Sequence, residues 1–238
     1  MNNFVCLVNY QAKERIIVMK TIMQEMKGVL CVAAMLVACF MAGQGAEMKD
    51  LFTSEPGVVF ELLGEATRIN MVSYYQNEQD VYATNRAANS SHIIELTSRH
   101  MVVEMSAGRT VELALLVNGK DSTIMVIEHF SVPYADACVT FYDTKWKLLK
   151  TGKFFKVPTI ESFIRPGTPK NVVKDIKQNV TFSLIDYELN KENLSTLVAR
   201  QHLADFFTPA DFARWKPYLY DTLTYTIVKN KINLTAPR

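Results

Sequence analysis

The pattern of hydrophobic and polar positions divides the chain near residue 46. Fifteen consecutive residues from Gly28 to Ala42 carry no charge; Lys27 precedes this run, and the small-residue stretch 43–46 follows it. A basic region, an apolar region and small residues, in that order, are typical of a secretory signal peptide. The run is shorter than the roughly 18 to 20 apolar residues of a membrane-spanning helix. We therefore predict that residues 1–46 are a secretion leader.

The leader is long for its class, which indicates an over-extended gene start. Met19 and Met26 each give a leader of about 15 to 30 residues, the usual range. The segment Leu36-Val37-Ala38-Cys39 also resembles a lipobox, in which the cysteine is lipidated. The predicted location is the periplasm or cell envelope, and the alternative is a lipoprotein anchored through Cys39.

After the leader the apolar spacing is first helical and then alternating. It predicts three helices: one over 48–52, one that starts at the cap candidates in 53–56 and reaches Leu63, and one over 68–79. From Val81 the period is two, which predicts strands over 92–96, 100–105, 110–117, 122–130, 137–143, 180–189, 193–203 and 223–232. Asn118-Gly119 marks a hairpin turn. A short helix is predicted near 171–177, and another begins at Pro209 with Thr208 as its N-cap.

These elements predict an α+β fold over residues 47–238, in a single domain. It is mainly an antiparallel β-sheet, with N-terminal helices and one C-terminal helix packed on it. Strand 110–117 has the clearest pattern: Leu115 belongs to its core face, together with Val117, and Glu112 to the wetter face.

Charge and cysteine content narrow the function classes. The leader holds four of the 26 basic and two of the 24 acidic residues, so the remainder is formally neutral. A neutral domain has no bulk attraction for phosphate polymers, so we expect no nucleic-acid partner. Cys6, Cys31 and Cys39 lie in the leader, and Cys138 alone cannot form an internal disulfide. Its apolar surroundings predict a small buried residue.

No phosphate-binding, zinc-protease or nucleophile-elbow motif occurs, so we predict no catalytic residue, cofactor or metal site. His100 and Glu104 share the strand face opposite the apolar one and are expected to point to solvent. A zinc site needs three or four ligands to converge, and no simple strand pairing brings the four histidines together. Ser122 and Thr222 follow aspartates in short motifs that resemble O-glycosylation sites of Bacteroidetes.

Several segments together resemble an uncharacterised family of exported Bacteroidales proteins, a domain-of-unknown-function family. The segments are MKDLF (48–52), ATNR (83–86), DSTIMVI (121–127), VTFYDTKWKLL (139–149) and FARWKPYL (212–219). The resemblance implies an envelope or periplasmic location and no particular activity. Some members carry a cysteine pair where this chain has Ser131 and Ala135, so no thiol role transfers.

The resulting hypothesis is a non-enzymatic exported protein that binds a protein or another envelope component. It would meet a membrane only through the leader or a lipid anchor. One alternative is a small secreted hydrolase or carbohydrate-active enzyme, which would show a nucleophile and a base converging in a cleft. Another is a carrier of an apolar ligand, which would show an aromatic-lined cavity.

Overall fold

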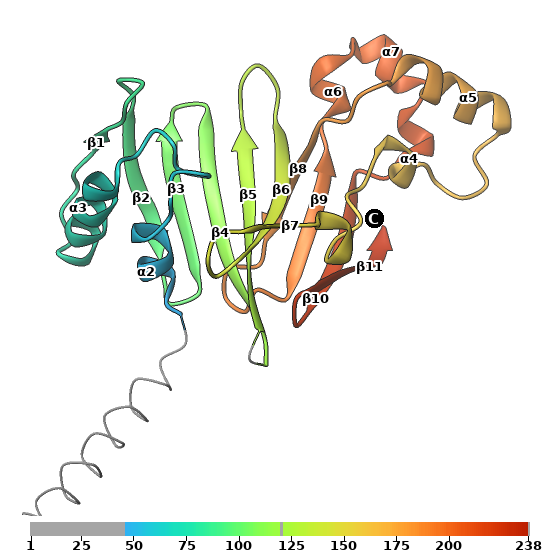
Figure 1. Ribbon diagram of the computed structural model, residues 1–238. Helices are drawn as coiled ribbons and strands as arrows, with labels where there is room; N and C mark the ends of the chain where they lie inside the picture. Colours follow the sequence, from blue (N-terminus) through green and yellow to red (C-terminus); the bar gives the residue numbers. More distant parts are fainter. Residues whose placement is uncertain (1–45, 120, 238) are drawn as a thin grey trace, which may run out of the picture. The chain divides into compact units, whose positions relative to one another are not determined.

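The computed structural model describes residues 46–119 and 121–237, which form two antiparallel sheets (Figure 1). The seven-stranded sheet has the order β1-β2-β3-β4-β5-β6-β7, and the four-stranded sheet has the order β11-β10-β9-β8. The strands are β1 Ala83–Thr84, β2 Ser90–Leu96, β3 His100–Ser106, β4 Arg109–Asn118, β5 Asp121–Phe130, β6 Asp136–Asp143, β7 Leu148–Leu149, β8 Ile185–Leu189, β9 Thr196–Gln201, β10 Thr222–Val228 and β11 Lys231–Pro237.

Helices flank both sheets. The α-helices are α2 Met48–Thr53, α3 Glu65–Gln76, α4 Ile160–Phe163, α5 Lys170–Asn179, α6 Leu203–Phe206 and α7 Pro209–Ala213; the 3-10 helices are η1 Thr151–Lys153 and η2 Lys216–Tyr218. The predicted fold class, α+β and mainly antiparallel, is confirmed. No helix in the described ranges is long and apolar enough to span a membrane. The predicted leader lies outside these ranges.

The central strands of the seven-stranded sheet are buried on both faces. On β4, Val111, Leu113 and Leu115 belong to a core shared with α2 and α3. Ala114 and Leu116 belong to a second core, shared with the four-stranded sheet and the later helices. Figure 1 shows α2 and α3 beside β1–β3, and α4–α7 gathered at the other sheet. Leu115 is only 3% exposed, which confirms its predicted place in the core.

Two-sided burial corrects the faces predicted for β4. Glu112, expected on the wetter face, is 5% exposed, because the four-stranded sheet and its loops cover that face. Val117, expected on the core face, is 42% exposed near the end of the strand. Asn118-Gly119 does form the turn, with Gly119 at a φ of +62° and Asn118 opposite Asp121.

Four other predicted elements differ in the structure. The helix predicted from 53–56 to Leu63 does not form, because the Glu55 carboxylate accepts the N–H groups of Gly57, Val58 and Val59 and holds them in a turn. The strand predicted over 180–189 begins only at residue 185, and the one over 223–232 is a hairpin of β10 and β11. The predicted C-terminal helix is short: α7 begins at Pro209 under the Thr208 cap, and η2 follows it.

Candidate functional site

A row of six ionisable side chains runs from one sheet to the other. Each bonds the next: Lys191 Nζ lies 3.1 Å from Glu95 Oε2, and Glu95 Oε1 lies 2.9 Å from His100 Nδ1. Glu112 joins two histidines, with 2.6 Å from Oε1 to His100 Nε2 and 3.2 Å from Oε2 to His129 Nε2. His129 Nδ1 lies 2.7 Å from Asp186 Oδ1. We call this row, Lys191–Glu95–His100–Glu112–His129–Asp186, the ionic chain.

Strand register explains why the middle of the ionic chain assembles. His100 on β3 pairs with Ala114 on β4, and His129 on β5 pairs with Thr110 on β4. Glu112 lies two residues from both of those partners and therefore on the same sheet face. It is thus the diagonal neighbour of both histidines. Asp186, on β8, belongs to the other sheet, so the ionic chain bridges the two sheets.

The ionic chain is arranged for alternating charge. Burial alone would lower the pKa of His129, but hydrogen bonds to Asp186 and Glu112 outweigh it and raise that pKa to about 9. The pKa of His100 is also raised, since its bonds to Glu112 and Glu95 outweigh the effect of burial. Burial would raise the pKa of Glu112, yet bonds from the two histidines lower it to about 2. Each of these two rings faces a carboxylate oxygen at both nitrogens and can donate from both only as an imidazolium, so basic and acidic side chains alternate along the ionic chain.

This arrangement leaves no ring nitrogen of His100 or His129 free for acid–base chemistry. Both ring nitrogens of His100 and of His129 bond to carboxylates, and His100 is 1% exposed. No histidine ring in the described residues hydrogen-bonds a serine, threonine or cysteine side chain, and no group of three potential ligands there is placed to hold a metal ion. The ionic chain is a satisfied polar network that fixes one sheet against the other.

The solvent position predicted for His100 is therefore wrong. The face it occupies is covered, and paired carboxylates compensate for burying the imidazole. Glu104, predicted beside it, is half-buried and lies 3.9 Å from His92 Nδ1. The fourth histidine, His202, pairs with Asp205 at 2.9 Å. Strand register thus brings two of the four histidines to one carboxylate, which the expectation from strand pairing missed.

The other residues singled out in the sequence lie apart from the ionic chain. Ser122 and Thr222 are half-buried, near the starts of β5 and β10. Cys39 lies outside the described residues. Cys138 is exposed, not buried as predicted, because it lies near the start of β6 opposite Glu128. Partial burial and the charges of Glu128 and Asp136 raise the pKa of its thiol, so it is not an activated nucleophile.

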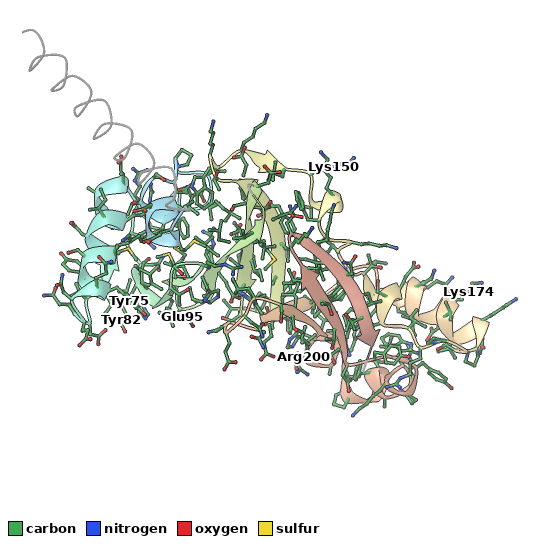
Figure 2. The ribbon with its side chains drawn as sticks, turned by 90° about the horizontal axis from the view of Figure 1, so that it is seen from below. Tyr75, Tyr82, Glu95, Lys150, Lys174 and Arg200 are labelled. Atoms are coloured by element: carbon green, nitrogen blue, oxygen red, sulfur yellow. The ribbon has the colours of Figure 1, made fainter. Side chains whose placement is uncertain are left out.

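A groove of about 700 Å³ lies beside β2, between Ile93 and Leu96 of that strand and the end of α3 with residues 78–80. Strand β1 pairs with β2 only at Ser90 and Ser91, so residues 92–96 have a strand partner on the β3 side alone within the described chain. Tyr75, Ile93 and Leu96 give the groove apolar surface, and the Tyr75 hydroxyl accepts the Leu96 N–H at 3.2 Å. Figure 2 shows Tyr75, Tyr82 and Glu95 at this end of the molecule.

Carboxylates outnumber cations around this groove: Glu47, Glu78 and Asp80 line it with a single lysine, Lys49. Lys49 bonds Glu47 at 3.0 Å, and no cation within the described residues lies within ion-pair distance of Glu78 or Asp80. A smaller groove of about 430 Å³ shares Thr97 and Ser98 with it and continues past the β2–β3 turn to Glu95 and Lys191. The exposed end of the ionic chain therefore borders a surface groove.

Comparison with known proteins gives a fold and a family. A solved structure, of a domain of an uncharacterised protein from Porphyromonas gingivalis W83, matches with a TM-score of 0.71 and 21% sequence identity. The match covers 81% of this chain and 100% of that one. No curated protein matches. The model of a family described as "Protein of unknown function (DUF3256)" matches residues 40–231, which confirms the resemblance to an uncharacterised family. This chain belongs to the DUF3256 family.

Proposed function

We propose that this protein is an exported, non-enzymatic binding protein, and that it takes an extended segment of a partner protein along the open edge of β2. The observation that carries the proposal is the groove beside that edge. Its volume, about 700 Å³, lies within the roughly 300 to 1,000 Å³ of ordinary binding sites. The leader pattern in the sequence supports export.

The chemistry of the groove favours a peptide backbone as its occupant. An unpaired strand edge offers N–H and C=O groups that another extended chain can pair with. On β2 these are the outward groups before Leu96, because the Tyr75 hydroxyl already accepts the Leu96 N–H. Ile93, Leu96 and Tyr75 supply apolar contact beside it, and Glu78 and Asp80 supply negative charge without a cationic partner. The fitting segment is therefore a strand with alternating apolar and basic side chains.

The two alternatives lack comparable support. A histidine-dependent hydrolase needs a ring that hydrogen-bonds a nucleophile, and the histidine rings of the described residues hydrogen-bond carboxylates only. A carrier of an apolar ligand needs an apolar cavity, whereas both grooves carry charged side chains.

Selection from a random peptide library displayed on phage tests the proposal. We expect enriched peptides with alternating apolar and basic residues. Their affinity, measured by fluorescence anisotropy, should fall about tenfold or more in a Glu78→Lys, Asp80→Lys variant because opposite charges become like charges. Glu61→Lys, Glu65→Lys is the matched control, since these exposed residues lie at or before the start of α3, away from the groove.

Backbone pairing is tested with two N-methylated versions of the selected peptide. Alternate residues of a strand point their N–H groups to opposite sides, so methylation of one alternate set should abolish binding and methylation of the other should preserve it. Equal binding of both versions, or unchanged affinity in the Glu78→Lys, Asp80→Lys variant, would refute the proposed mode.

A further inference from the structure

A surface rich in lysine lies apart from the β2 groove. Two segments form it: residues 144–158, with five lysines and no acidic residue, and residues 228–232, with two more lysines and no acidic residue. All seven side chains are exposed. We call this the lysine surface; its members are Lys145, Lys147, Lys150, Lys153, Lys156, Lys229 and Lys231.

The two segments are held together by direct contacts. The Ile232 N–H donates to the Phe154 carbonyl at 2.8 Å, and Ile232 forms a bridge with Phe155. Lys231 Nζ donates to the Lys153 carbonyl and lies 5.4 Å from the centre of the Phe154 ring. These contacts place Lys153 beside Lys231, and the other five lysines lie on the same two segments on either side of this junction. Figure 2 shows Lys150 on a different side of the molecule from Glu95 and Arg200.

The positive charge of this surface is not neutralised locally. Within the described residues, no carboxylate lies within ion-pair distance of any of the seven lysines, whereas Lys49, Lys177 and Lys191 each pair with a glutamate. The nearest acidic residue in sequence, Asp143, uses Oδ1 to accept the backbone N–H groups of Lys145 and Lys147 at 2.9 Å. It shapes the turn that presents these two lysines.

Apolar side chains are exposed among the lysines. Leu148 is 61% exposed, Val157 46% and Val228 55%. A soluble anionic polymer would satisfy the lysines but would leave these three side chains in water. An anionic bilayer satisfies both, because its headgroups attract lysines and its interface takes up apolar side chains. The mixed chemistry thus favours a membrane surface as the partner.

We propose that the lysine surface binds the protein to an anionic membrane surface. This contact is independent of the β2 groove and uses other residues, so either proposal can fail alone. It also adds a contact beyond the leader or a lipid anchor. In polybasic segments, each lysine near an anionic lipid surface typically raises the partition coefficient about fivefold.

Co-sedimentation with lipid vesicles tests this inference. We expect the full chain to bind vesicles containing one third phosphatidylglycerol more tightly than vesicles of phosphatidylcholine alone, and less tightly at about 0.5 M salt, where charges are screened. A Lys147→Gln, Lys150→Gln, Lys229→Gln variant should lose roughly 100-fold in partitioning to the anionic vesicles. Leu148→Ser should weaken the same binding several-fold.

The matched control removes the same charge elsewhere. Lys170, Lys174 and Lys216 are exposed on α5 and η2, and their replacement by Gln should change partitioning little. The leader contributes equally to every variant, so the difference isolates the lysine surface. Equal loss in both triple variants, or no preference for anionic vesicles, would overturn the inference. So would tight binding to heparin without binding to vesicles, which would identify a soluble polymer as the partner.

Discussion

Glu112 should be the most costly single side chain of the ionic chain to neutralise. It bonds both buried histidines, and its pKa is lowered from 4.5 to about 2. At about 1.4 kcal/mol per pKa unit, that difference corresponds to about 3 kcal/mol of folding free energy at neutral pH. Glu112→Gln keeps the shape and removes the charge, so we expect the free energy of unfolding to fall by about 3 kcal/mol. The interaction of Glu112 with the two histidines both lowers the pKa of Glu112 and raises the pKa values of the histidines, so its free energy is counted only once.

The direction in which stability changes with pH follows from the pKa shifts of Glu112 and His129. The contribution of Glu112 is complete above its unfolded pKa near 4.5 and is lost as the pH falls toward about 2. The contribution of His129 is complete below its unfolded pKa near 6.5 and is lost as the pH rises through about 9. The ionic chain therefore stabilises the fold most between about pH 4.5 and 6.5. Between about pH 6 and 9.5 the wild-type protein should lose about 3 kcal/mol.

Urea unfolding followed by tryptophan fluorescence measures both effects, because Trp146 and Trp215 are buried in the two different cores. Glu188→Gln is the control: Glu188 is an exposed residue on β8 and should have little effect. A wild-type stability that does not change from about pH 6 to 9.5 would contradict the reasoning. So would a cost for Glu112→Gln no larger than that for Glu188→Gln.

Three further outcomes are expected. Leu115→Ala should cost about 2 to 5 kcal/mol in urea unfolding, and Val117→Ala, at an exposed position of the same strand, much less; equal costs would mean that burial does not decide the effect. Arg68 is 3% exposed, lies 3.6 Å from the buried Glu55 and donates to the Phe52 and Leu63 carbonyls. Arg68→Ala should therefore lower the free energy of unfolding by about 3 to 5 kcal/mol, and a loss below about 1 kcal/mol would contradict this. N-terminal sequencing of protein from its host should begin at or near Glu47, and palmitate labelling abolished by Cys39→Ser would establish the lipoprotein alternative instead.

Local sequence signals were enough to predict most strands and one turn. The alternation of apolar and polar residues predicted the bounds of β2 to β6 within a few residues, and the Asn118-Gly119 sequence predicted the turn between β4 and β5. The turn between β10 and β11 has no glycine or proline; it uses Lys229 at a φ of +60° and Asn230, so the two strands were predicted as one. A turn of this composition lacks a local signal strong enough to interrupt an alternating pattern.

Tertiary burial was not predictable in the same way. His100 and Glu112 follow the alternation of a strand with one wet face, and only the second sheet turns that face into an interior. Net charge was equally uninformative about surfaces. A formally neutral domain has one groove edged with carboxylates and, elsewhere, seven exposed lysines without carboxylate partners. A sum over the chain cannot show how charges are separated in space.

The order of strands in the sheets has a consequence for how the chain acquires its structure. Every strand of the first sheet pairs with the strand before it, and the second sheet adds β8 to β11 in the same sequential way. Each connection between paired strands is short except the one between β9 and β10, where residues 202–221 intervene. When the chain leaves a ribosome or a translocation channel with its N-terminus first, each new strand can pair with the edge of the strands that are already folded. Such sequential growth keeps each unpaired edge exposed for a short time, which limits misassembly during synthesis.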